Sequence, residues 1–243
     1  MKNTIVILLF ISILLNILFL LSATVFIVKI GGFSYLLQKI VASNYHSNNY
    51  PIYYLHQKSQ FEILPKSDSG IIFLGDSLTD EGEWGELLDN PNIKNRGIGG
   101  DTTDLILNRL DAVVASKPKK VFLMVGINDL INAHKSVEQT LTGYKQILTE
   151  LRKKAPNTKV FLQSVLPVNN QVTSYWQDKK NILQLNLQLR EVAKEFSFEY
   201  IDVFSHLSDS QNQLDARYTL DGLHLNGQGY LMWKQAIEKY VKE

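Results

Sequence analysis

The chain of 243 residues contains no cysteine and has almost no net charge, +1 at pH 7. Without cysteine, disulfide bonds, thiol nucleophiles and thiolate metal sites are all excluded. The near balance of 25 basic and 24 acidic side chains argues against nucleic acid or an acidic polymer as a partner. The composition is otherwise ordinary for a globular protein, with 45% hydrophobic and 20% charged residues.

Charge is missing altogether from one long stretch near the N-terminus, which runs from Thr4 to Val28 between Lys2 and Lys29. This stretch exceeds the roughly 20 residues that a helix needs to cross a bilayer. Its best small-x-small sequence, Leu21-Ser22-Ala23, is a poor signal-peptide cleavage site because leucine stands where a small residue belongs. We therefore expect residues 1–30 to be a membrane anchor. A cleaved signal, which would make the chain secreted, is the alternative.

The anchor divides the rest of the chain into two further regions. Residues 31–69 are expected to be a juxtamembrane linker followed by a packing helix over Tyr53–Leu64, and residues 70–243 to be one domain. Large domains are translocated largely regardless of nearby charge, so we expect this domain to lie outside the cell, held by a single-pass helix.

Short apolar runs alternate with helical patterns from Gly70 onward. The predicted strands are Ile71–Leu74, Ile93–Asn95, Lys120–Val125, Lys159–Ser164 and Glu199–Val203. The predicted helices are Trp84–Leu88, Thr103–Ala115, Ser136–Lys154, Gln177–Phe196 and Gly227–Lys242. This alternation predicts an α/β fold, a parallel sheet with helices on both faces.

Four polar blocks follow the ends of predicted elements or occupy the last loop. They are Gly-Asp-Ser-Leu-Thr-Asp at 75–80, Asn-Arg-Gly-Ile-Gly-Gly-Asp-Thr at 95–102, Gly-Ile-Asn-Asp at 126–129 and Asp-Gly-Leu-His-Leu-Asn at 221–226. Ligands of open α/β sheets bind at the carboxyl ends of the strands, so these blocks mark the expected site.

Three residues of these blocks have the chemistry of a serine nucleophile, its base and a carboxylate that orients the base. The hydroxyl of Ser77 needs an adjacent base, and His224 is a candidate. Asp221, three residues earlier, is placed to bond the other imidazole nitrogen and fix its tautomer. Taken singly, Gly-Asp-Ser also suits a turn and helix cap, and Asp221 with His224 also suits a surface pair.

Acyl transfer also needs donors for the oxyanion that develops on the carbonyl oxygen. Gly100 can bring its backbone N–H close because it has no Cβ, Asn128 offers a side-chain amide, and Ser77 offers its own backbone N–H. Singly, Gly100 also suits a turn and Asn128 a loop contact. The presence of all four blocks together, in this order along the chain, is far harder to attribute to chance than any one block alone.

With these blocks the chain resembles the SGNH/GDSL hydrolases, over about residues 70–240. The Asn-Arg-Gly-Ile-Gly-Gly-Asp-Thr-Thr run most resembles the branch of the platelet-activating-factor acetylhydrolase catalytic subunits. The resemblance implies a three-layer α/β/α sandwich around a five-stranded parallel sheet of flavodoxin-like order. It also implies that Ser77 is the nucleophile, with His224 and Asp221 completing the triad, and that no metal or organic cofactor is needed.

By the same resemblance, Ser77, Gly100 and Asn128 are expected to form the oxyanion hole, and Gly97 is given no catalytic role. The G-x-S-x-G elbow of the α/β-hydrolases is absent around Ser77, so a different esterase fold is expected.

These features together predict a membrane-anchored serine esterase that cleaves an acyl ester, such as an acetyl or lipid ester. Tyr175 and Trp176 are candidates to border an acyl pocket, although aromatic residues also serve packing. A carbohydrate O-acetyl esterase or acyltransferase of the same fold is an alternative, and so is an anchored binding module without activity. The sequence leaves the oligomeric state open.

Overall fold

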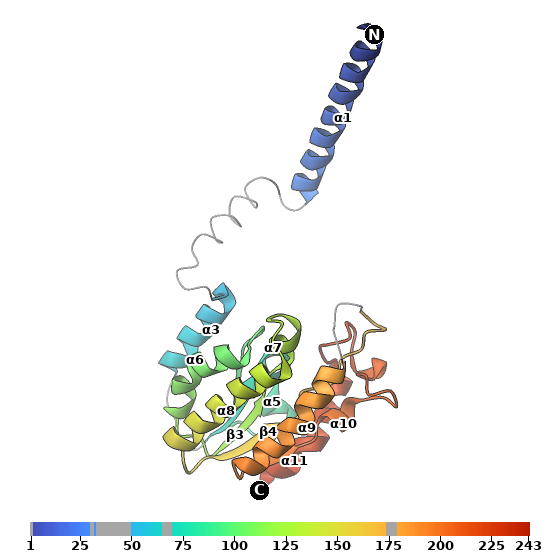
Figure 1. Cartoon of the computed structure of the whole chain (residues 1–243). Helices are drawn as coiled ribbons and strands as arrows, with labels where there is room; N and C mark the ends of the chain where they lie inside the picture. Colours follow the sequence, from blue (N-terminus) through green and yellow to red (C-terminus); the bar gives the residue numbers. More distant parts are fainter. Residues whose placement is uncertain (1, 30–31, 33–49, 65–69, 174–178) are drawn as a thin grey trace. The chain divides into compact units, whose positions relative to one another are not determined.

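The computed structural model describes residues 2–29, 32, 50–64, 70–173 and 179–243 (Figure 1). It divides into two units, Met1–Ile52 and Tyr53–Glu243, each of which is described by itself. Most of the predicted juxtamembrane linker lies outside the described residues, and so do Tyr175 and Trp176. The predicted domain boundaries at 30 and 69 stay predictions.

The first unit contains helix α1, Lys2–Lys29. Its segment Ile5–Phe26 is long and apolar enough to cross a membrane, a property that an N-terminal signal sequence would share. Three of its polar side chains bond back to the helix itself, and one of these is Ser22, whose Oγ donates to the Phe19 carbonyl at 2.8 Å. Asn16 Nδ2 donates to the Ser12 carbonyl at 2.8 Å, and Thr24 Oγ1 donates to the Leu20 carbonyl at 2.8 Å. These bonds lower the cost of placing polar groups in hydrocarbon.

The second unit is an α/β domain whose strands begin where the sequence predicts. The strands are β1 (Ile71–Gly75), β2 (Ile93–Gly97), β3 (Lys120–Met124), β4 (Lys159–Gln163) and β5 (Glu199–Ile201). The helices are α3 (Ile52–Ile63), α4 (Ser77–Asp80), α5 (Trp84–Leu87), α6 (Thr103–Val114), α7 (Ile127–Ile131), α8 (Val137–Lys154), α9 (Lys179–Glu195), α10 (Phe204–Leu207) and α11 (Gly227–Lys242).

The five strands form one parallel sheet in the order β2-β1-β3-β4-β5. The predicted five-stranded sheet is therefore confirmed. After β2 the chain crosses back over β1 to form β3, so the strand order reverses between β1 and β3. Open α/β sheets bind ligands beside such a reversal. Here the carboxyl ends of β1 and β3 precede Ser77 and Asn128, two of the predicted site residues.

Helices cover both faces of the sheet. Helices α6, α8 and α9 pack side by side over one face (Figure 1). On the other face, three phenylalanines from β1, β3 and β4 stack across the strands. The ring centroids of Phe73 and Phe122 are 4.8 Å apart, and those of Phe122 and Phe161 are 4.6 Å apart. Trp84 of α5 stacks on Phe73, and Trp233 of α11 meets Trp84 edge-on. This ladder joins the helix layer to the sheet.

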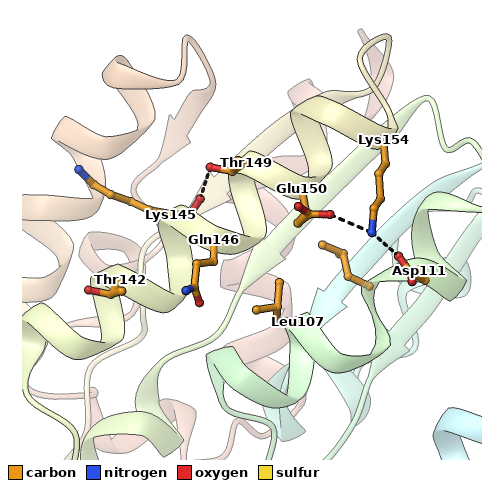
Figure 2. Close-up of a pocket in the computed structure, with 9 residues that line it drawn as sticks. Leu107, Asp111, Thr142, Lys145, Gln146, Thr149, Glu150 and Lys154 are labelled. Carbon is orange, nitrogen blue, oxygen red and sulfur yellow. Dashed lines mark hydrogen bonds and ion pairs between the residues drawn. The ribbon is translucent and has the colours of Figure 1, made fainter.

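A surface cavity of about 610 Å³ lies between α6 and α8 (Figure 2). Lys154 of α8 bonds Asp111 of α6 and Glu150 of its own helix at its rim, with distances of 2.6 and 2.8 Å. Leu107 of α6 also lines it. None of the predicted site residues belongs to its described lining, so it is distinct from the site at the ends of β1 and β3.

Candidate active site

The turn after β1 carries Ser77 as the first residue of α4. Asp76 caps this helix, because its Oδ1 accepts the Leu78 N–H at 3.1 Å. Strand and helix approach so closely here that a Cβ on Gly75 would lie 2.2 Å from Thr79 Oγ1. Glycine is therefore required before Asp76, and the turn delivers the Ser77 hydroxyl to the edge of the sheet.

The structure brings His224 and Asp221, the two residues predicted to act on that hydroxyl, into line with it. Ser77 Oγ lies 3.1 Å from His224 Nε2, and His224 Nδ1 lies 2.7 Å from Asp221 Oδ2. Asp221 uses its other oxygen to accept the backbone N–H groups of Leu223 and His224, at 2.9 and 2.8 Å. The short loop thus folds onto the carboxylate and fixes the imidazole against it.

The charge on Asp221 is held by these bonds. Burial by itself disfavours the carboxylate, but hydrogen bonds from the His224 ring and from two backbone N–H groups outweigh it. The net effect holds the pKa of Asp221 below its usual value. The carboxylate is therefore ionised at neutral pH, as a group that stabilises an adjacent imidazolium must be.

The second block lies beside the serine. A Cβ on Gly99 would lie 3.9 Å from the Ser77 Cβ, which places the glycine loop beside the hydroxyl. Gly100 adopts a φ of 85°, a conformation that favours glycine. Within the parts of the chain that the structure describes, the backbone N–H groups of Ser77 and Gly100 donate no hydrogen bond. Both remain available to a ligand oxygen.

The amide of Asn128 is buried at the start of α7, with 4% of its surface exposed. Its Nδ2 donates one hydrogen bond to the Asp101 carbonyl at 3.1 Å. Its Oδ1 accepts from Asn132 Nδ2 at 2.7 Å. These two contacts fix which end of the amide carries the NH₂ group and leave a second N–H on Nδ2 for another acceptor.

Buried carboxylates support the loops behind this site. Burial raises the pKa of Asp76 to about 8. Asp101 forms a buried ion pair with Arg109, whose Nε lies 2.7 Å from Asp101 Oδ2. Burial nevertheless raises the pKa of Asp101 to about 6, because the charge and hydrogen bond of Arg109 offset only part of the effect of burial. Asp129 accepts the Thr103 N–H at 2.9 Å and so anchors the start of α6.

Two residues near the site are absent from the sequence-based prediction. Asn132 orients Asn128, and Glu81 places Oε1 3.9 Å from His224 Nε2. Each follows a predicted site residue by four positions on a short helix, and residues with that spacing lie on one helix face. This four-residue spacing is a signal in the sequence from which both residues could have been predicted. No pattern in the sequence, however, indicates that either short helix reaches that far.

The described residues include no group of three or more His, Asp or Glu side chains placed to hold a metal ion. The candidate site residues offer hydrogen-bond donors, acceptors and a serine hydroxyl, groups that suit a reaction at a carbonyl carbon.

The chain is similar to several known proteins. The chain is 26% identical over 185 residues to platelet-activating factor acetylhydrolase IB subunit alpha2 of Rattus norvegicus, covering 73% of this chain and 78% of that protein. It is 31% identical over 183 residues to N-acylneuraminate cytidylyltransferase of Escherichia coli, which is 72% of this chain. The chain spans only 41% of that second protein.

Solved structures show the same fold. A Streptococcus pneumoniae protein described as a platelet activating factor is 29% identical, with a TM-score of 0.71, covering 85% of this chain and 99% of that one. An acetylxylan esterase from Geobacillus stearothermophilus is 20% identical, with a TM-score of 0.59, covering 74% and 96%. At that lower identity the likeness concerns the fold alone.

The family match spans the whole set of polar blocks. The model described as the GDSL-like lipase/acylhydrolase family matches residues 73–232, from the middle of β1 into α11. That range includes Ser77 and His224, the whole of β3 and the carboxyl end of β1. The chain is a hydrolase that belongs to the GDSL-like lipase/acylhydrolase family.

Proposed function

We propose that the chain is a membrane-anchored serine esterase that cleaves an acyl ester with Ser77, His224 and Asp221. The observation that carries the proposal is the chain of contacts from Ser77 Oγ through His224 to Asp221, at 3.1 and 2.7 Å. A hydroxyl, an imidazole and a carboxylate in this order form a nucleophile, its base and the group that orients the base.

In the first step the Ser77 oxygen attacks the ester carbonyl carbon and passes its proton to His224 Nε2. The negative charge on the carbonyl oxygen is stabilised by the N–H groups of Ser77 and Gly100 and by the Asn128 amide. The ester bond then breaks, and the leaving alcohol takes the proton from His224. The acyl group remains bound to Ser77.

In the second step His224 takes a proton from water as the water oxygen attacks the acyl carbon. The same donors stabilise the second oxyanion. Collapse releases the carboxylic acid and returns the proton to Ser77. Asp221 keeps its negative charge throughout and stabilises the imidazolium that forms in each step.

The substrate proposed first is an acetyl or lipid ester. The relative from Rattus norvegicus is named for platelet-activating factor acetyl hydrolysis, and the chain covers 78% of it. Helix α1, which is apolar enough to cross a membrane, would hold the site close to lipid. The relative named for N-acylneuraminate favours a second candidate, an ester of an acylated sugar, which the enzyme would hydrolyse or transfer.

Steady-state kinetics of the full chain and of Ser77→Ala test the proposal on one panel of esters. The panel contains acyl esters of increasing chain length and acetylated glycans. We expect Ser77→Ala to reduce kcat by about 10⁴-fold or more on the preferred ester. Full activity in Ser77→Ala, in protein free of contaminating esterase, would refute the proposal. A strong preference for acetylated glycans would select the second candidate substrate.

A further inference from the structure

Asp80, the last residue of the helix that begins with Ser77, binds two neighbouring segments through one carboxylate oxygen. Its Oδ2 accepts the Gly99 backbone N–H at 3.2 Å and the Tyr53 hydroxyl at 2.7 Å. The backbone of Asp80 is fixed as well, since its carbonyl accepts Asn95 Nδ2 at 2.9 Å. A carboxylate on a fixed backbone therefore joins the serine helix, the glycine loop and helix α3.

Tyr53 is oriented to donate its proton to that carboxylate. Gln57 Nε2 donates to the Tyr53 hydroxyl oxygen at 3.2 Å, which leaves the hydroxyl proton for Asp80. The hydrogen bond to Asp80 raises the pKa of Tyr53, so the phenol stays protonated over the working range of an esterase. The ring also lies 3.5 Å from the position of a Cβ on Gly99. Tyr53 thus contacts both the carboxylate and the loop that the carboxylate holds.

Helix α3 does not need Tyr53 in order to stay on the domain. The adjacent Tyr54 is 1% exposed, and its hydroxyl donates to the Leu105 carbonyl and Asn108 Oδ1 of α6. Further along α3, the Phe61 ring lies under the Arg96 guanidinium, 4.7 Å from its centroid. Tyr53 itself is 47% exposed, against 1% for Tyr54. Its contribution is the hydrogen bond to Asp80.

The loop that Asp80 holds is a turn closed by the Asp101 N–H, which donates to the Ile98 carbonyl at 3.1 Å, and inside that turn the Gly99 N–H is bonded to Asp80. Gly99 and Gly100 carry no side chains, and nothing lies within 4 Å of the position of a Cβ on Gly100. The direction of the Gly100 N–H depends on the peptide that Gly99 begins. An oxyanion donor stabilises charge only when it is held in the right direction before the reaction starts.

We propose that Tyr53 is a positioning residue: it holds the Asp80 carboxylate on the Gly99 N–H and thereby aims the Gly100 N–H at the oxyanion. This role rests on the serine esterase function proposed above. It makes α3, which precedes the region matched by the family model, a working part of the site.

Two neighbouring tyrosines on α3 provide a matched pair of variants in the full chain. Tyr53→Phe removes only the hydroxyl that bonds Asp80, and we expect kcat to fall about 10-fold while KM and the melting temperature change little. Tyr54→Phe removes hydroxyl bonds that join α3 to α6 instead. We expect it to lower the melting temperature and leave kcat unchanged.

A double-mutant comparison separates positioning through Asp80 from any other effect. In an Asp80→Ala background, adding Tyr53→Phe should cost no further activity, because the carboxylate that Tyr53 holds is already gone. An unchanged kcat in Tyr53→Phe would overturn the proposal. So would an equal loss in the presence and absence of Asp80.

Hydrogen exchange of the peptide that contains Gly99 and Gly100 reports on the loop without any turnover. We expect faster exchange in Tyr53→Phe than in the parent chain or Tyr54→Phe, and equal rates would overturn the proposed positioning. Ser77→Ala is assayed beside these variants. If it keeps full activity, the esterase function fails, while the exchange rates still show whether Tyr53 holds the loop.

Discussion

Ser77 and His224 are separated by 147 residues, yet Ser77 Oγ and His224 Nε2 lie 3.1 Å apart. Ser77 is fixed by the end of β1, and His224 by the loop that leads into α11. Their contact therefore exists only when the sheet and the last helix are both in place. We expect esterase activity and folding of the domain to be lost together.

Asn128 offers the first kinetic prediction. Asn128→Ala removes a donor that would contact the oxyanion, so kcat should fall by about 10²–10³-fold with a smaller change in KM. Asn132→Ala leaves that donor in place but frees the amide that Asn132 orients. Its loss should be about 10-fold. Steady-state kinetics on one short acyl ester measure both, and a larger loss in Asn132→Ala would contradict the assignment.

Two glycines of the second block should respond differently to alanine. A Cβ on Gly97 would lie 2.2 Å from the Asp80 backbone nitrogen, so Gly97→Ala forces the serine helix away from β2. We expect a loss of about 3 kcal/mol in the free energy of unfolding. Gly100 has open space at that position, and its positive φ alone costs about 1 kcal/mol with alanine.

Urea unfolding of both glycine variants tests that order. Gly97→Ala should be the less stable of the two, although the sequence comparison assigns it no catalytic role. A greater loss of stability in Gly100→Ala would show that the close contact between Gly97 and the Asp80 backbone is absent in solution.

The buried carboxyl of Asp76 predicts a pH dependence of stability. Its pKa is raised to about 8 in the folded protein, from 3.8 in the unfolded chain, so the folded state binds the proton more tightly. Stability should therefore fall as pH rises from about 4 to about 8, by at most about 1.4 kcal/mol per pH unit from this group. Asp101, with a pKa raised to about 6, acts in the same direction.

Asp76→Asn provides the comparison, since asparagine keeps an acceptor oxygen for the Leu78 N–H and cannot ionise. Unfolding free energies at pH 5, 6, 7 and 8 should decline less steeply in this variant. The slope against pH should correspond to about one fewer proton released on unfolding than in the parent chain. Identical slopes for the parent chain and Asp76→Asn would rule out titration of Asp76 in this range.

Helix α1 predicts where the protein is found. An uncleaved anchor should keep the full-length chain in the membrane fraction after alkaline carbonate washing, with the N-terminal residues present in its intact mass. A domain outside the cell should be digested by protease added to intact cells. Release of a shorter chain into the medium would show a cleaved signal instead, and protection from protease would reverse the orientation.

Much of the domain follows from local patterns in the sequence. The apolar run that begins at Lys120 and the run that begins at Lys159 are both strands, because side chains apolar on consecutive positions suit a sheet buried on both faces. The predicted helix Gly227–Lys242 has the same bounds in the structure. The predicted residues Ser77, His224 and Asp221 lie together, as the order of the blocks suggested.

Contacts between distant polar residues did not follow from the sequence. The buried ion pair of Asp101 with Arg109 is one such contact. The bond between Tyr53 and Asp80 joins residues 27 positions apart on two separate helices. Neither contact leaves a periodic pattern in the sequence, because a hydrogen bond of this kind depends on how the segments of the folded chain pack against one another.

A fluorophosphonate probe tests Ser77 as the nucleophile without knowledge of the natural ester. The probe forms a covalent bond only with a serine that an adjacent base activates. We predict one adduct on the folded full chain, mapped by peptide mass to Ser77, with none on Ser77→Ala and slower labelling of His224→Ala. A folded chain that takes up no probe at Ser77 would contradict the esterase function and favour an anchored binding module.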